Sequence, residues 1–168
     1  MQRRRLLQLG LGATAVLALV GGGAAWWHPG WVDGRLSTGG AAVFRGVARA
    51  VLDGSLPADA PTREAALDAH ARRLQAAIAS LAPAPRAELS QVLALLSAVP
   101  GRRLLAGLAT DWPQASTADI GAALQSMRTS PLAVRQQVYH ALRDLTNAAW
   151  YVDEATWPAL GYPGPVAV

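Results

Sequence analysis

Apolar residues recur at steps of three and four along most of the chain, and this spacing predicts helices with one buried face. Five helices and one shorter helical segment are expected, at residues 40–53, 61–81, 86–99, 102–108, 116–128 and 131–152. Glycine and proline provide stop signals, such as Gly54 after the first helix and Pro83 after the second. No run alternates between apolar and polar residues well enough to predict a strand.

Four of these helices carry an apolar stripe that is expected to face a common core. The stripes comprise Phe44, Val47, Ala48 and Val51; Leu67, His70, Leu74, Ile78 and Leu81; Leu89, Val92, Leu93 and Leu96; and Val134, Val138, Leu142, Leu145 and Ala149. The helix at 116–128 begins with a capping box formed by Ser116 and Asp119. The predicted fold is therefore all-α, a compact bundle of four to five helices.

The N-terminus has the pattern of an export signal. A run of arginines that includes Arg4 and Arg5 is followed by Leu6, Leu7 and an uncharged stretch that reaches Val20. A basic region followed by an apolar region is typical of a signal peptide. Paired arginines directly before two leucines resemble the twin-arginine type, so the twin-arginine translocase is an expected partner.

An uncleaved signal-anchor is the alternative interpretation of the same segment. The apolar stretch approaches the roughly 20 residues that a bilayer span needs. Trp26, Trp27 and Trp31 follow it, where an interfacial aromatic belt would lie. Both interpretations place the rest of the chain in the periplasm, associated with the inner membrane.

Four segments are expected along the chain. Residues 1–25 form the signal or signal-anchor helix, and residues 26–38 form a connector. Residues 39–152 form the helical domain, and residues 153–168 form an extended C-terminal tail.

Charge and cysteine content exclude several classes of function. The net charge of +4 includes three arginines of the predicted signal; removing these from the fifteen basic residues leaves twelve against eleven acidic ones, a net charge of +1. This balance indicates no nucleic-acid partner. The chain has no cysteine, which excludes disulfides, thiolate metal sites and covalently attached c-type haem within it.

No set of residues predicts catalysis, cofactor binding or a metal site. His70 lies on an apolar stripe and is expected in the core, while His140 is expected at a surface or interface. The one carboxylate at metal-ligand spacing from a histidine is Asp144, four residues after His140, and a single pair of this kind does not predict a metal site. Asp153 and Glu154 form an acidic pair that is expected to be solvated. The sequence therefore predicts that this chain is not an enzyme, although an unrecognised enzyme remains an alternative.

The C-terminal sequence AWYVDEATWPALGYPGPV, residues 149–166, is unusually rich in aromatic residues and proline. Large aromatic side chains are common anchors for a partner protein, but they could equally fold back on the chain's own helices. The predicted partner-binding residues are Trp150, Tyr151, Trp157, Gly161, Tyr162, Pro163, Gly164 and Pro165.

This tail resembles the C-terminal signature of the gluconate 2-dehydrogenase subunit 3 family, which includes the gamma subunit of bacterial FAD-dependent glucose dehydrogenase. Residues 44–57, FRGVARAVLDGSLP, are similar to the family's first helix and its end. The resemblance implies a non-catalytic small subunit that assists folding, export and assembly of a periplasmic, FAD-dependent catalytic subunit. That partner would be of the glucose–methanol–choline (GMC) type and would act on a sugar or alcohol.

The same resemblance implies where the cofactors are. FAD would be bound by the catalytic subunit and haem by a membrane-bound cytochrome c, with none in this chain. The competing interpretation is a stand-alone, membrane-tethered helical scaffold in the periplasm, held at the bilayer by the tryptophans near residue 30.

Overall fold

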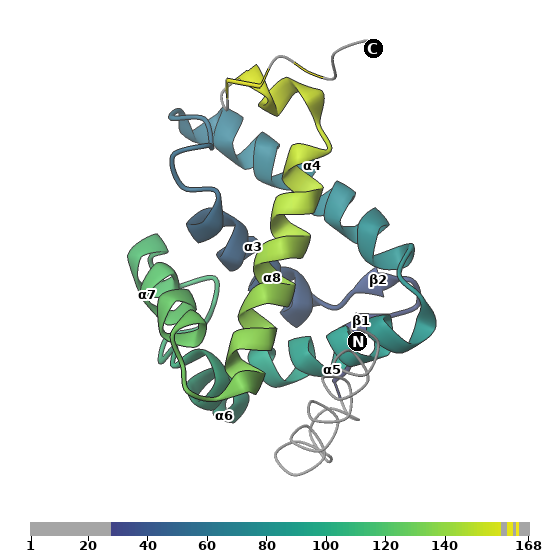
Figure 1. The fold of residues 1–168 in the computed structure, drawn as a ribbon, viewed down its shortest axis with the longest axis vertical. Coiled ribbons are helices and arrows are strands. Elements are labelled where there is room, and N and C mark those ends of the chain that lie inside the picture. The colour runs from purple at the N-terminus through teal and green to yellow at the C-terminus, as the bar shows by residue number, and fades with distance from the viewer. Residues whose placement is uncertain (1–27, 159–160, 163, 165–168) are drawn as a thin grey trace, which may run out of the picture.

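The computed structural model describes residues 28–158, 161–162 and 164, and most of these residues are helical (Figure 1). The six helices of this part of the chain are α3 (Thr38–Val51), α4 (Ala60–Ala79), α5 (Pro83–Ser97), α6 (Val99–Gly101), α7 (Thr117–Arg128) and α8 (Ala133–Tyr151). A π-helical turn, η1 (Arg102–Ala106), follows α6, and a 3-10 turn, η2 (Glu154–Thr156), follows α8. The predicted helical character is confirmed. The predicted signal helix lies outside the described residues.

One prediction is wrong, because a short antiparallel hairpin lies where only a connector was expected. Its strands β1 (Trp31–Val32) and β2 (Arg35–Leu36) pair Trp31 with Leu36. Asp33 and Gly34 form the two-residue turn between the strands. Both have positive φ angles, 49° and 79°, as a type I′ hairpin turn requires. The sequence signal was the Asp-Gly pair, but the strands are too short to show alternation.

Helix α3 lies at the centre and packs against α4, α5, α7 and α8 (Figure 1). Ser37 caps its N-terminus, because the side-chain oxygen accepts a hydrogen bond from the Gly40 amide at 3.1 Å. Its core residues Phe44, Val47 and Ala48 are at most 2 % exposed, so this predicted stripe is confirmed.

The predicted stripes on α4, α5 and α8 also face the core. Fully or nearly buried members include Leu67, Leu74, Ile78, Leu93, Leu96, Val138 and Leu142. The predicted cap of α7 is present in half: Ser116 Oγ accepts from the Asp119 amide at 3.1 Å, and the Asp119 carboxylate accepts from the Ser116 hydroxyl at 2.7 Å. The shorter segment near residue 102 is helical, but it forms a π-helical turn that ends at Gly107.

Trp112 fills the space beneath α3, although it lies outside every helix. It is 1 % exposed, and its indole Nε1 donates to the Leu96 carbonyl at 2.8 Å. A Cβ atom on Gly46 of α3 would lie only 3.0 Å from the indole ring. The loop before α7 therefore contributes a core residue, and α3 accommodates it by having no side chain at that position.

Two glycines with ordinary helical geometry differ sharply in the space around them. A Cβ atom on Gly101 would collide with the carbonyl of Leu95, 2.7 Å from its carbon, whereas one on Gly121 of α7 would meet nothing within 4 Å. The backbone of Leu95 cannot change rotamer to relieve such a contact, as a side chain could. Gly101 is therefore required by packing, and Gly121 is not.

We expect Gly101→Ala to lower the free energy of unfolding by about 2 kcal/mol or more, because the backbone must shift. Gly121→Ala should raise it by about 0.5–1 kcal/mol, the usual gain when alanine replaces glycine inside a helix. Chemical denaturation of both variants beside the parent chain measures the two changes. Equal effects at the two positions would contradict the packing explanation.

Candidate partner-binding surface

Trp150, the first predicted partner-binding residue, lies inside the protein. It is 6 % exposed and packs in a cluster with Ala48 of α3, Leu52 directly after that helix and Leu67 of α4. Its role in the described structure is therefore to join the C-terminal end of α8 to these two helices. This position differs from the expected partner contact.

Two side chains of α4 hold the same end of α8. His70, 2 % exposed, donates from Nε2 to the Thr146 carbonyl at 3.0 Å. Arg73 donates from Nε to the Ala149 carbonyl at 2.9 Å and lies 3.0 Å from an oxygen of Asp153. The last four carbonyls of a helix lack N–H partners within it, so Arg73 satisfies a free acceptor at Ala149, while His70 adds a contact from α4 one turn earlier. The prediction that His70 belongs to the core is confirmed.

The chain turns back directly after α8. Asp153 accepts from the Ala155 amide at 3.1 Å and so caps the 3-10 turn η2. The indole Nε1 of Trp157 then donates to the Tyr151 carbonyl at 2.8 Å. Residues 153–157 therefore form a turn directly after α8.

Trp157 and Tyr162 form a small aromatic unit that we call the C-terminal cap. Their ring centroids are 5.3 Å apart in an edge-to-face arrangement, and the Tyr162 amide donates to the Trp157 carbonyl at 3.2 Å. Gly161 and Gly164 have positive φ angles of 69° and 98°, which glycine adopts without strain. The predicted residues Pro163 and Pro165 lie outside the described residues.

The cap leaves an aromatic side chain at the surface. Tyr162 is 48 % exposed and the nearby Val152 is 66 % exposed, while Trp157 is half-buried. Trp157 contacts the end of α8 through the Tyr151 carbonyl. The exposed ring of Tyr162 remains available for contact with another protein.

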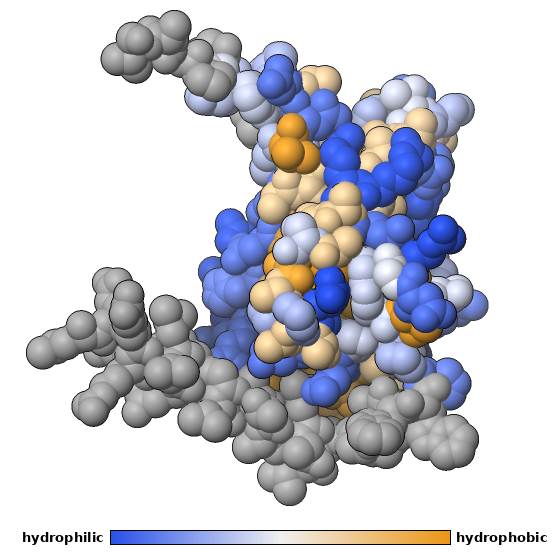
Figure 2. Space-filling view, turned by 90° about the vertical axis from the view of Figure 1, so that its right-hand side faces the viewer, coloured by the Kyte–Doolittle hydropathy of each residue, from blue (hydrophilic) through white to orange (hydrophobic). Residues whose placement is uncertain are grey.

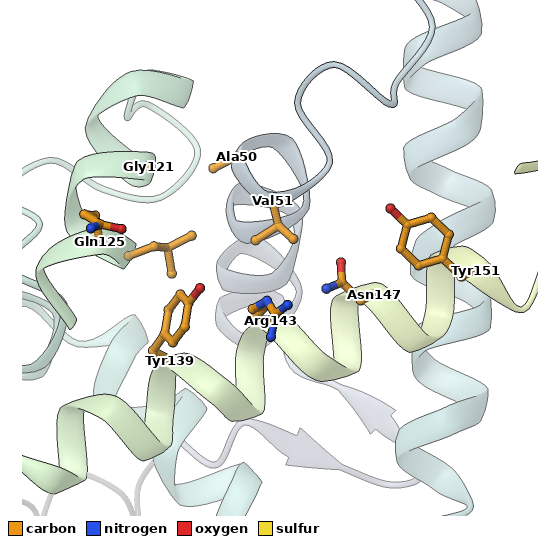
Figure 3. A pocket seen from close by; sticks show the side chains of 9 residues that line it. Ala50, Val51, Gly121, Gln125, Tyr139, Arg143, Asn147 and Tyr151 are labelled. Carbon is orange, nitrogen blue, oxygen red and sulfur yellow. The ribbon is translucent and has the colours of Figure 1, made fainter. Parts of the chain in front are cut away.

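Tyr151 belongs to a second feature, a groove of about 360 Å³ that runs along α8. One wall is a row of α8 side chains at four-residue steps, Tyr139, Arg143, Asn147 and Tyr151 (Figure 3). The other wall is formed by Ala50 and Val51 at the end of α3 and by Gly121, Leu124 and Gln125 of α7. Sequence reasoning missed this groove, because a row of polar positions on a helix usually marks a solvated face.

His140 lies beside the groove and is exposed, as predicted for a surface position. Its ring centroid is 5.1 Å from that of Tyr139, in an edge-to-face contact. Figure 2 shows the right-hand side of Figure 1; where coloured residues are visible there, hydrophilic and weakly hydrophobic ones dominate and strongly hydrophobic ones are scattered.

The predicted export residues Arg4, Arg5, Leu6 and Leu7 lie outside the described residues. Within residues 28–158, 161–162 and 164, no helix is long and apolar enough to span a membrane. No group of three or more acidic or histidine side chains in that same part of the chain is arranged to hold a metal ion. Comparison of the whole chain with protein-family models, with curated proteins and with solved structures found no match.

His70 should make stability depend on pH. Its pKa lies below the ordinary value of 6.5, chiefly because burial disfavours the charged imidazolium; the nearby Arg73 acts in the same direction, and the hydrogen bond to Thr146 opposes it. An unfolded chain therefore takes up this proton at a higher pH than the folded one. The free energy of unfolding should fall as pH drops below about 6.5, until the lower folded-state pKa is passed.

We expect the fall in the free energy of unfolding at low pH to be smaller in His70→Gln, which cannot titrate but keeps an N–H donor for the Thr146 carbonyl. Denaturant melts at about pH 7.5 and about pH 5 give this fall for the parent chain and for the variant. Equal pH dependence in the two proteins would show that His70 does not carry the effect.

Proposed function

We propose that this chain is the non-catalytic small subunit of a periplasmic, FAD-dependent dehydrogenase of the GMC type, and that it assists folding, export and assembly of the catalytic subunit. The observation that carries the proposal is the C-terminal signature from Trp150 to Pro165. The half-exposed ring of Tyr162 supports it, because aromatic side chains of this kind often provide much of the binding energy at protein interfaces.

The predicted export signal also supports the proposal. The twin-arginine pathway moves folded proteins, often with a bound partner, and a small chain without cysteine does not itself need to be exported in the folded state. A larger flavoprotein that lacks its own signal would need to be exported folded, together with a partner that carries the signal. The substrate pocket and the FAD would then belong to the catalytic subunit, and a membrane-bound cytochrome c with haem would accept the electrons near the inner membrane.

The proposal predicts that a flavoprotein co-purifies with this chain. The tagged full chain, purified in mild detergent from its native host, should bring down a second protein with flavin absorbance. Tyr162→Ala should weaken the complex by about 2 kcal/mol, or roughly thirtyfold in Kd, with little change in the melting temperature of the chain. Leu132→Ala is the matched control, because Leu132 is 58 % exposed at the other end of α8.

Co-purification of proteins without flavin would contradict the dehydrogenase assignment. Purification of the chain alone, with its N-terminus uncleaved, would instead favour the membrane-tethered scaffold. If a flavoprotein is present and Tyr162→Ala lowers only the melting temperature, the cap closes the chain's own helices and another surface binds the partner.

The proposal also predicts export of both subunits by the twin-arginine route. Replacing Arg4 and Arg5 together by lysine keeps the charge but removes the recognised side chains. Chain and flavoprotein should then both remain in the cytoplasm, as measured by fractionation and immunoblotting. Arg35→Lys, an exposed change in the hairpin, should leave export normal. Undiminished periplasmic accumulation of the double variant would contradict the assignment.

A further inference from the structure

We propose that the groove along α8 binds an extended, acidic peptide segment of a partner protein. This inference names the chemistry of the bound segment, and it does not depend on whether the partner carries flavin. Tyr139 and Tyr151 mark the two ends of the groove wall. Twelve residues of helix separate them, or about 18 Å along the axis. A fully extended segment of about five residues has the same length.

Charge supplies the argument for an acidic segment. Arg143 is the only charged side chain among the nine residues that line the groove, and it is the second of the four residues in the row on α8. Its side chain is 47 % exposed, and its ion pair is with Asp144, its own neighbour, at 3.2 Å on the open surface. Such an exposed pair contributes at most about 1 kcal/mol. A carboxylate held inside the groove could therefore replace Asp144 and form a two-point contact with the guanidinium.

The other side chains of the row suit a peptide backbone. Asn147 carries both a donor and an acceptor, so its amide can pair with the N–H and C=O groups of an extended chain. The side chains of Tyr139 and Tyr151 stand on the same side of α8 as Asn147 (Figure 3). Tyrosine and arginine are also the residue types most often found at the energetic centres of protein interfaces.

Small residues on the opposite wall leave room for that backbone. Ala50 has a single methyl group, and the space beside Gly121 is open, since a Cβ atom there would meet nothing within 4 Å. A partner helix would need apolar anchors along the groove. The row on α8 provides polar and aromatic groups instead, which favours an extended segment over a helix.

The test selects peptides from a displayed random library on the purified full chain in mild detergent. Peptides rich in Asp and Glu should be enriched. Fluorescence anisotropy with the best labelled peptide should show binding at least about tenfold weaker for Gly121→Leu, which fills the groove, and for Arg143→Glu, which reverses its charge. Arg143→Glu should keep the melting temperature of the parent chain, and Gly121→Leu should not lower it, because leucine favours a helix more than glycine does.

Two control variants make the same chemical changes outside the groove. Ala122→Leu adds the same side chain at the next, exposed position of α7, and Arg72→Glu reverses an exposed arginine of α4. Both should bind the peptide as the parent chain does. Loss of binding in all four variants would indicate a general effect of charge or stability and would overturn the proposal.

Three further results would overturn it. Selected peptides could lack acidic residues, or Gly121→Leu and Arg143→Glu could bind them normally. Sedimentation could instead show a dimer of the parent chain that Gly121→Leu dissociates, in which case a second copy occupies the groove. A failure to co-purify any flavoprotein would count against the proposed function alone, because the peptide selection uses only this chain.

Discussion

The fold depends on how closely other segments approach α3. This helix is surrounded on several sides, and it tolerates that position because small residues occur where neighbours come nearest. A Cβ atom on Gly40 would lie 2.7 Å from the Gly30 carbonyl oxygen, and one on Gly46 would press on Trp112 and on Ile120. Larger residues there would push Gly30, or Trp112 and Ile120, away from α3 and leave voids beside it. Voids of this kind lower the free energy of unfolding, because the interior is otherwise closely packed with alanine and leucine side chains.

Arginine side chains supply a second constraint, which the composition did not reveal. Several of them donate to backbone carbonyls at helix ends and in loops: Arg49 to Trp112 and Ala115, Arg63 to Pro57 and Ala58, Arg73 to Ala149, Arg86 to Ala79, and Arg135 to Leu105. The guanidinium group suits this task, because its donors are arranged in a planar fork and it is never neutral. These contacts fix how successive helices meet without requiring many ion pairs.

Periodicity predicted the helices and their buried faces because burial repeats with the turn of a helix. It predicted neither Trp112 nor the hairpin, since a core residue in a loop and strands of two residues have no period. Trp150 is a different case. It follows Leu142 and Thr146 at four-residue steps on a buried face of α8, so its burial could have been predicted. The aromatic content of the tail suggested a surface role and obscured that signal.

The buried and exposed groups at the end of α8 support one another. His70, Arg73 and Trp150 fix the last turns of the helix to α4 and α3, so the backbone that carries Tyr151 and the C-terminal cap has a defined position. Binding to a surface that is already ordered avoids the entropy of immobilising it. The groove and the cap share Tyr151, whose side chain lines the groove and whose carbonyl holds Trp157. A partner that contacts both features would therefore bind on either side of one residue, Tyr151.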